Sequence, residues 1–207
     1  SVWMSTPSPA DAAIVFADIA GVGKGAGAGE GLGNHCLRHI REGNAIGQVV
    51  RCFESGDIHH VSGSIDPVRD IEVINTELIL ADLASLQKRR DRLQKELRMG
   101  SKTAKAEDAL IEKLLPHLDS GKPAITLELA DEEKIVAREF FLLTSKPTLF
   151  ACNVGESDLA AIAQQDESNA AWRRVRAVGP FATSHFATDA VVISAQIESE
   201  LADLPEA

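Results

Sequence analysis

An aspartate and a glycine three residues apart, Asp18 and Gly21, form the first pattern in this sequence that could do chemistry. They follow a short apolar run, Ile14 to Phe16, whose β-branched residues are typical of a buried parallel strand. A carboxylate at a strand end can hold a magnesium ion or its water, and a glycine lets a backbone N–H approach a terminal phosphate. The pair fits the Asp-x-x-Gly element of phosphate-binding enzymes, although a strand followed by a flexible turn fits it equally well.

The glycine-rich stretch that follows partly resembles two other phosphate-binding patterns. A Walker A loop needs a glycine five residues before its Gly-Lys pair and a serine or threonine after it, whereas Gly23-Lys24 has Asp18 and Gly25 at those positions. The dinucleotide-binding pattern Gly-x-Gly-x-x-Ala matches from Gly21, but a run so rich in glycine and alanine matches in several registers. A fragment of an NAD-binding dehydrogenase therefore stays as an alternative.

Two motifs late in the chain resemble the base-reading motifs of GTPases, Asn-x-x-Asp and Ser-Ala. The first is Asn153-Val154-Gly-Glu156, and the second is Ser194-Ala195. In the first motif Glu156 replaces the aspartate that accepts two hydrogen bonds from guanine. Because the longer side chain displaces the carboxylate, guanine loses its bidentate partner and adenine becomes acceptable.

The elements that must position these residues predict an α/β fold, a doubly wound and mainly parallel sheet with an inserted helical hairpin. The expected strands span residues 14–16, 45–53, 147–154 and 189–194, and the expected helices span 32–42, 70–98, 104–118 and 131–143. Ligands of such sheets bind at the carboxyl ends of the strands, and Asp18, Asn153 and Ser194 all fall there.

The predicted hairpin has the pattern of an antiparallel coiled coil. Ile79, Leu86 and Leu93 recur every seven residues, and charged residues surround them. Its basic cluster is a possible contact for RNA or a ribosome-like partner, although a solvated coiled-coil flank explains it too; the cluster comprises Lys88, Arg89, Arg90, Arg92, Lys95 and Arg98. The expected division of the chain is a loose lead-in at 1–13, a nucleotide-binding part at 14–69, the coiled-coil insertion at 70–130 and a second nucleotide-binding part at 131–207.

Composition narrows the classes of function. A chain of 207 residues with 44% hydrophobic and 25% charged residues is long enough to bury a core. Its formal net charge of -10 argues against a protein that coats nucleic acid with its whole surface, so we expect no DNA partner. No apolar run approaches the ~20 residues needed to cross a bilayer. Cys36, Cys52 and Cys152 are odd in number and widely spaced, which indicates reduced thiols in a cytosolic protein.

Taken together, these motifs make the chain resemble the YchF, or Obg-like ATPase, family. The resembling segments cover residues 14–204 and are FADIAGVGKGAGAGEGLGN, IREGNAIGQVVRCFESGDIHHV, DPVRDIEVINTELILADL, KPTLFACNVGE and ISAQIESELADL. The resemblance implies an ATP-hydrolysing switch protein of the GTPase superfamily that binds GTP weakly and uses Mg²⁺. It also implies a cytoplasmic protein without a membrane partner, whose coiled coil contacts the large ribosomal subunit or RNA.

The resemblance also assigns roles to individual residues. Asp18 corresponds to the metal-binding residue, acting through water, and Gly21 to the γ-phosphate switch. The residues that correspond to the adenine site are Asn153, Val154, Glu156, Ser194 and Ala195. An apolar Val22 stands where many GTPases orient water with a glutamine, as is typical of this family. His60 matches the family's loop histidine, so the resemblance makes it the candidate for activating water.

His60 lies in the expected loop at residues 54–67, beyond the end of a predicted strand. A histidine there can give a proton or a positive charge to a phosphate, although a solvated loop histidine fits the same position.

The sequence departs from the family in two places. The family begins with a strand and a Walker A loop and ends in a small TGS domain, and neither is present. We therefore expect an internal fragment that is a poor ATPase by itself, because the missing loop supplies the lysine and the backbone groups that anchor phosphate. A non-catalytic module that binds a ribosome or RNA through the hairpin is the main alternative to an ATPase switch.

Overall fold

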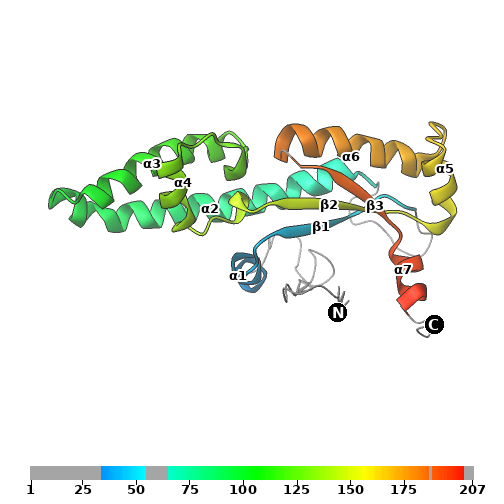
Figure 1. Ribbon diagram of the computed structural model, residues 1–207, viewed down its shortest axis with the longest axis horizontal. Helices are drawn as coiled ribbons and strands as arrows, with labels where there is room; N and C mark the ends of the chain where they lie inside the picture. The colour runs from blue at the N-terminus through cyan, green and yellow to red at the C-terminus, as the bar shows by residue number, and fades with distance from the viewer. Residues whose placement is uncertain (1–33, 55–64, 187, 203–207) are drawn as a thin grey trace, which may run out of the picture.

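A three-stranded parallel sheet with strand order β1-β2-β3 organises the structure (Figure 1). The computed structural model describes residues 34–54, 65–186 and 188–202. In the register, Ile46 lies opposite Thr148 at one end of the β1–β2 pair, and Asn153 lies opposite Ile193 at the far end of the β2–β3 pair. The predicted α/β class with a parallel sheet is thereby confirmed. The expected strand at 14–16 and lead-in at 1–13 lie outside the described residues.

The strands and helices follow the expected order along the chain. The strands are β1 (Ile46–Arg51), β2 (Thr148–Asn153) and β3 (Ala190–Ile193). The α-helices are α1 (Asn34–Glu42), α2 (Pro67–Arg98), α3 (Lys102–Asp119), α4 (Asp131–Arg138), α5 (Leu159–Ala163), α6 (Ala170–Phe186) and α7 (Ala195–Ala202). The described residues also form three short 3₁₀ helices: η1 (Ala124–Thr126), η2 (Leu143–Ser145) and η3 (Glu156–Asp158).

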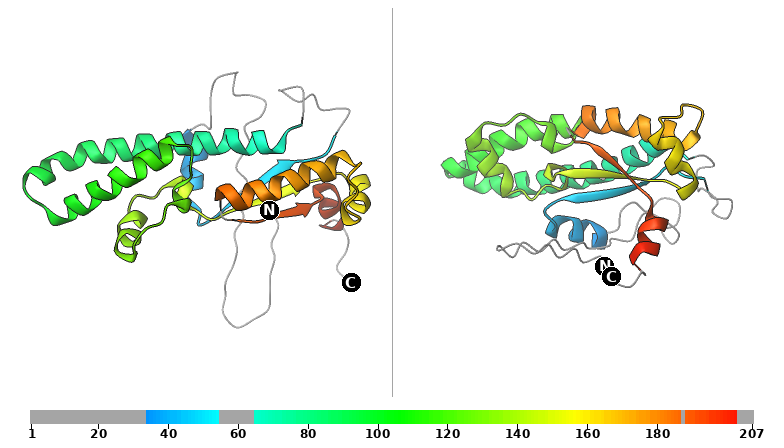
Figure 2. Two further views of the ribbon diagram at one scale, coloured as in Figure 1. Left: turned by 90° about the horizontal axis from the view of Figure 1, so that it is seen from above. Right: turned by 45° about the vertical axis from the view of Figure 1, so that its right-hand side comes forward.

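Helices α2 and α6 cover one face of the sheet, while α1 and α7 lie on its other side (Figures 1 and 2). Alternating residues of the strands point toward the covered face, as the two-residue period of a strand requires. The core there consists of Val50, Cys52, Ile71, Phe150, Cys152, Val154, Val178, Ala182 and Phe186. Burial of these apolar side chains supplies the main driving force for the sheet and its two covering helices.

The hairpin of α2 and α3 extends away from the sheet (Figure 2, left). Ile79, Leu86 and Leu93 are each at most 7% exposed, so the seven-residue repeat does mark the side of α2 that faces its partner. Gly100 turns the chain between the helices with a φ of 78°, a left-handed conformation that favours glycine. No helix in the described ranges is long and apolar enough to span a lipid bilayer.

Helix α2 begins earlier than its apolar pattern predicts. Asp66 caps it by accepting a hydrogen bond from the backbone N–H of Arg69 at 3.1 Å, and Pro67 takes the first helical position. Both are recognised start signals, so the sequence contained this boundary. Ile71, near the start of α2, packs into the core beneath the sheet, so one helix joins that core to the hairpin.

The expected helix at 131–143 ends at Arg138 instead. Phe140, Leu142 and Leu143 are all buried, whereas Phe141 is 63% exposed. Such a pattern does not fit one face of a helix, and the chain reaches it through a φ of 49° at Phe141. The apolar run was correctly predicted to return to the core, but its helical periodicity was wrong.

A fully buried carboxylate, Asp82, joins the hairpin to the segment that leads into β2. Its Oδ1 accepts a hydrogen bond from the N–H of Leu143 at 2.8 Å. Its Oδ2 accepts from the N–H of Thr144 at 2.8 Å and from the Thr144 hydroxyl at 2.7 Å. Burial raises the pKa of Asp82 above its ordinary range, and the hydrogen bonds oppose that rise.

The raised pKa of Asp82 gives the free energy of unfolding a defined pH dependence. The folded chain holds the Asp82 proton more tightly than the unfolded chain does. The resulting stabilisation is complete below the ordinary pKa of 3.8 and is lost as pH rises through the folded-state pKa. We expect the difference in unfolding free energy between the wild type and Asp82→Asn to change over this range in denaturant titrations. If the unfolding free energies of the wild type and Asp82→Asn change with pH in parallel, Asp82 is not the source of this pH dependence.

Candidate functional site

The two motifs that are predicted to read a base meet at the carboxyl ends of β2 and β3. Asn153 lies opposite Ile193 in the sheet, and Val154 continues the pairing by donating its N–H to the Ile193 carbonyl at 2.9 Å. The chain then leaves β2 toward α5 and leaves β3 toward α7 (Figure 1). Parallel strands deliver their ends to one edge, so the two motifs become neighbours although about 40 residues separate them in the sequence.

One hydrogen bond links the two motifs directly. The Asn153 Oδ1 accepts from the backbone N–H of Ala195 at 3.0 Å. This N–H belongs to the first residue of α7. The N–H groups in the first turn of a helix have no acceptor within the helix itself. The Asn153 side chain therefore fixes the start of α7 against the end of β2.

Ser194 lies at the centre of this junction. Its carbonyl accepts from the N–H of Glu198 at 3.0 Å, as the residue that starts helix α7 should. Its side-chain hydroxyl is buried and has no hydrogen-bond partner in the described part of the chain. A buried hydroxyl without a partner costs roughly 1–3 kcal/mol, so the packing around Ser194 leaves a polar atom at this junction unsatisfied.

The other two residues of the first motif differ in their exposure. Val154 is 1% exposed and packs in the core, so its side chain supports the loop and only its backbone faces the junction. Glu156 is exposed at the start of η3, and its carboxylate forms no hydrogen bond or ion pair with the described residues. The carboxylate is therefore available at the position where the sequence predicts contact with a base.

Two residues that were not predicted as site residues support the loop that carries Glu156. Asp158 Oδ1 accepts a hydrogen bond from Asn169 Nδ2 at 3.0 Å. Asn169 also caps α6, since its Oδ1 accepts from the N–H of Trp172 at 2.9 Å. An asparagine directly before the first residue of a helix is a recognisable cap, but nothing local predicts its second bond to Asp158.

A third unpredicted residue, Arg174 of α6, holds the end of β1. Its Nη1 donates to the Cys52 carbonyl at 3.3 Å, and its Nη2 donates to Glu54 Oε1 at 2.6 Å. The hydrogen bond from Arg174 lowers the pKa of the Glu54 carboxyl. This pair therefore ties the chain just beyond β1 to the same helix that supports the Glu156 loop.

The cysteines contribute to packing beside the site. Cys52 and Cys152 are fully buried on the covered face of the sheet. A hydrogen bond between the two thiols and their burial raise the pKa of Cys52. None of the three cysteines, all of which lie in described residues, forms a disulfide.

The structure does not describe the predicted phosphate and metal residues. Asp18, Gly21 and His60 are outside the described residues, and so is the glycine-rich stretch on which the dehydrogenase alternative rests. Within residues 34–54, 65–186 and 188–202 no group of three or more His, Cys, Asp or Glu side chains could hold a metal ion. The structure therefore describes the residues that are predicted to contact a base, while Asp18 remains the predicted ligand for Mg²⁺.

Comparison with curated proteins gives close relatives for nearly the whole chain. A ribosome-binding ATPase YchF of Escherichia coli O157:H7 is 44% identical over 92% of this chain, and one of Bacillus subtilis (strain 168) is 43% identical over 93%. Obg-like ATPase 1 of Saccharomyces cerevisiae is 41% identical over 76% of this chain. No family model matches the sequence.

A solved structure, that of the Schizosaccharomyces pombe YchF GTPase, matches with a TM-score of 0.73 and 31% identity over 91% of this chain. The parallel sheet, the meeting motifs and this match define a chain of the P-loop NTPase class. Over nine tenths of its length the chain belongs to the YchF/Obg-like ATPase family. It spans about half the length of the bacterial relatives and of the solved structure, since the matched part is 50% of each.

Proposed function

We propose that this chain is part of an ATP-binding and ATP-hydrolysing switch protein that also binds GTP weakly. The observation that carries the proposal is the hydrogen bond from the Ala195 N–H to Asn153 Oδ1, because it assembles the two base-reading motifs into one site. The exposed Glu156 carboxylate and the unpartnered Ser194 hydroxyl lie in the motifs that this bond joins. Adenine is the proposed base, since Glu156 replaces the aspartate that would hold guanine.

The catalytic part of the proposal rests on the family resemblance. Asp18 would hold Mg²⁺ through water, and Gly21 would offer a backbone N–H to the γ-phosphate. His60 would activate or orient the attacking water. Magnesium bound there would neutralise charge on the phosphates during transfer.

The proposed partner is the ribosome, in particular its large subunit, contacted through the coiled coil. The relatives in Escherichia coli and Bacillus subtilis carry ribosome binding in their names. We propose residues 70–130 as the inserted unit that makes the contact, and 14–69 with 131–207 as the nucleotide-binding unit. A ribosome partner implies a cytoplasmic protein. Exposed lysines and arginines on α2 favour RNA as the contacted component.

Replacing Glu156 with aspartate is expected to move base preference toward guanine. The shorter side chain restores a carboxylate at the position that accepts two hydrogen bonds from guanine. Calorimetric titration should show the ratio of the Kd for GTP to the Kd for ATP falling by about tenfold or more. Because the chain spans half of its relatives, the titration is also run on a chimaera that carries the remaining half of the Bacillus subtilis protein.

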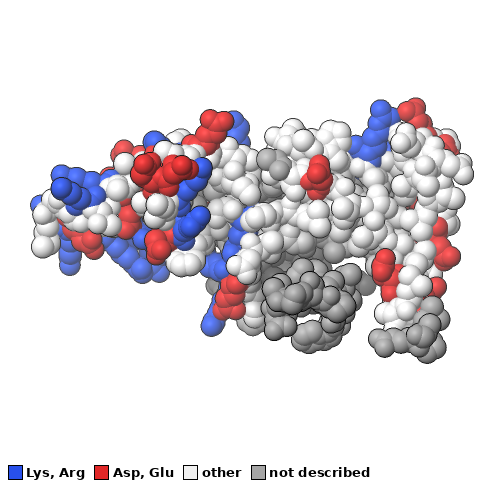
Figure 3. Space-filling view, in the orientation of Figure 1, with Lys and Arg blue, Asp and Glu red and all other residues white. Residues whose placement is uncertain are grey.

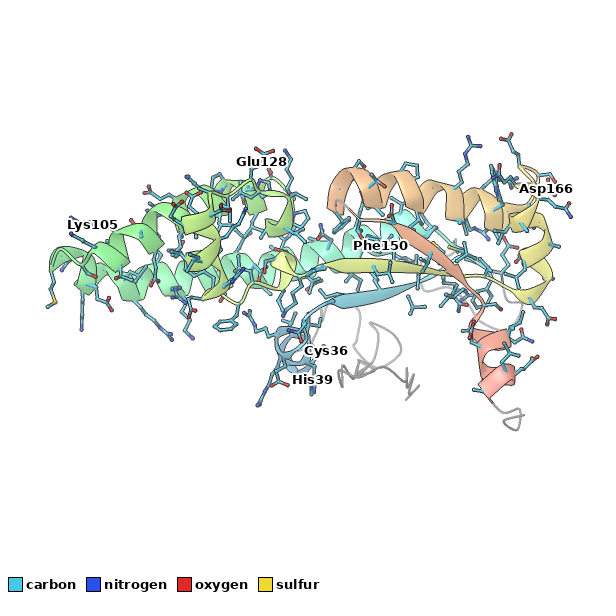
Figure 4. All side chains as sticks on the ribbon, in the orientation of Figure 1. Cys36, His39, Lys105, Glu128, Phe150 and Asp166 are labelled. Carbon is cyan, nitrogen blue, oxygen red and sulfur yellow. The ribbon has the colours of Figure 1, made fainter. Side chains whose placement is uncertain are left out.

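The matched control is Glu128→Asp, the same chemical change at an exposed position on the far side of the molecule (Figure 4). It should leave both dissociation constants unchanged. If ATP and GTP bind and the ratio is the same in Glu156→Asp as in the wild type, Glu156 does not read the base.

A further inference from the structure

Helix α1 has little apolar packing to hold it in place. None of the side chains of residues 36–42 is fully buried, and a helix of nine residues is too short to persist in water by itself. Charged side chains crowd the hairpin and α1 on the face shown in Figure 3, whereas the middle of the molecule, over α6 and β2, is largely uncharged. Polar contacts with neighbouring segments must therefore contribute much of what holds α1.

Lys146, just before β2, supplies the first of these contacts. Its Nζ donates to the Arg41 carbonyl at 3.1 Å and also to the Gly43 carbonyl. The last carbonyls of a helix have no donor within the helix, and an ammonium group beside them also complements the helix dipole. Partial burial and the charge of Arg41 lower the pKa of Lys146, while Asp82 opposes this change. The charges of Lys146, Arg41 and Asp82 therefore lie close enough to influence one another.

Arg41 of α1 supplies the second contact, on the segment between α4 and η2. Its Nη1 donates to the Phe141 carbonyl at 3.2 Å. Phe141 is 63% exposed and has a φ of 49°. A bulky residue rarely adopts this left-handed conformation, and such strain persists only where surrounding contacts hold it. One of these contacts is the hydrogen bond from Arg41.

The same segment is joined to the hairpin through Asp82. The Asp82 carboxylate on α2 accepts hydrogen bonds from the N–H groups of Leu143 and Thr144. Residues 141–146 are therefore held by α1 and by α2 together. In the sequence, α1 follows the glycine-rich stretch that contains Gly21, the predicted γ-phosphate residue. The segment thus lies between the helix that follows this stretch and the base of the hairpin.

We propose that Arg41 and Lys146 form a latch through which the terminal phosphate of a bound nucleotide sets the conformation of residues 141–146 at the base of the hairpin. This rests on the proposed function, because it requires a nucleotide that acts on α1. A ligand shifts a conformational equilibrium only if it interacts differently with the two states, and ADP lacks the phosphate that Gly21 is proposed to contact. The strained turn at Phe141 is the element that can change, since a return to negative φ relieves its strain.

The latch is tested first by amide hydrogen exchange of the full chain without nucleotide. The variant Arg41→Gln/Lys146→Gln removes both charged donors. The control Arg38→Gln/Lys134→Gln makes the same change in charge at exposed residues, each of which forms an ion pair within its own helix. We expect the amides of α1 and of residues 141–146 to exchange about tenfold faster in the latch variant and less than about twofold faster in the control. Unchanged exchange in α3 shows that the fold is intact.

The connection to the nucleotide is then measured on the chimaera that carries the remaining half of the Bacillus subtilis protein. Compared with ADP, a non-hydrolysable ATP analogue should change the exchange of residues 141–146 at least about twofold in the wild type and in the control. In the latch variant the change should occur in α1 without reaching residues 141–146. A merely structural role of Arg41 and Lys146 would leave this nucleotide-dependent difference in place.

Three results would overturn the proposal, and they separate its failure from that of the proposed function. Exchange of residues 141–146 that is equal in the latch variant and the wild type would show that the two side chains do not hold this segment. If the analogue binds but residues 141–146 do not respond, or respond equally in the latch variant, the latch fails while ATP binding stands. If the wild-type chimaera binds neither nucleotide, the proposed function fails and the connection to the nucleotide fails with it.

Discussion

Replacing Asp82 with alanine is expected to lower the free energy of unfolding by about 3–5 kcal/mol, the largest effect anticipated for one side chain here. The change leaves two backbone N–H groups and one hydroxyl, from Leu143 and Thr144, without their acceptor in a buried place. Each such group costs roughly 1–3 kcal/mol unless water enters. Urea titration with a two-state fit measures the loss.

The control for this variant is Asp91→Ala, on the same helix. Asp91 is exposed and accepts one hydrogen bond, from Gln87 Nε2 at 3.2 Å. Its loss should change the unfolding free energy by no more than about 0.5 kcal/mol. If Asp82→Ala costs less than about 1 kcal/mol, the carboxylate is not the joint between the hairpin and the sheet.

The position of Asp82 explains why the effect should reach beyond the hairpin. Helix α2 contributes Ile71 to the core under the sheet and Leu86 to the core of the hairpin, and Asp82 lies between them. Its partners Leu143 and Thr144 lead within a few residues into β2, which carries Asn153 at its end. Asp82 therefore links the hairpin to the segment that leads into the strand carrying the proposed base site.

Replacing Asn153 with alanine is expected to weaken ATP binding about tenfold or more. The change removes the acceptor for the Ala195 N–H and releases the start of α7 from the end of β2. The two base-reading motifs then have to be ordered by the ligand, which reduces the measured affinity. Calorimetric titration on the chain and on the Bacillus subtilis chimaera gives the dissociation constants.

Loss of stability alone must be separated from loss of the site. Ser101→Ala removes a comparable bond, from the Ala104 N–H to a capping hydroxyl, at the far end of the hairpin. Loss of such a cap costs about 1 kcal/mol of stability. This control should melt earlier without any change in nucleotide affinity. If both variants bind ATP like the wild type, the Asn153–Ala195 bond does not assemble the site.

Much of the fold was predictable because its signals are local. Apolar runs placed β1, β2 and β3, and the seven-residue repeat placed the buried side of α2 at Ile79, Leu86 and Leu93. These signals depend on the spacing of residues within one element, which the sequence displays directly. The start of α2 at Asp66-Pro67 was equally visible in the sequence. The non-helical backbone from Phe140 to Leu143 was not, because its conformation depends on how these side chains pack.

The sequence by itself determined the class of fold, the order of the motifs and the residue types that face the proposed base. The tertiary structure decided which side chains meet: Asn153 with Ala195, Asp82 with Leu143, and Arg174 with Glu54. It also divided the basic cluster into internally paired arginines and exposed charges. The physical reason is that a polar side chain finds its partner through the path of the whole chain, whereas an apolar side chain only needs the correct face of its own element.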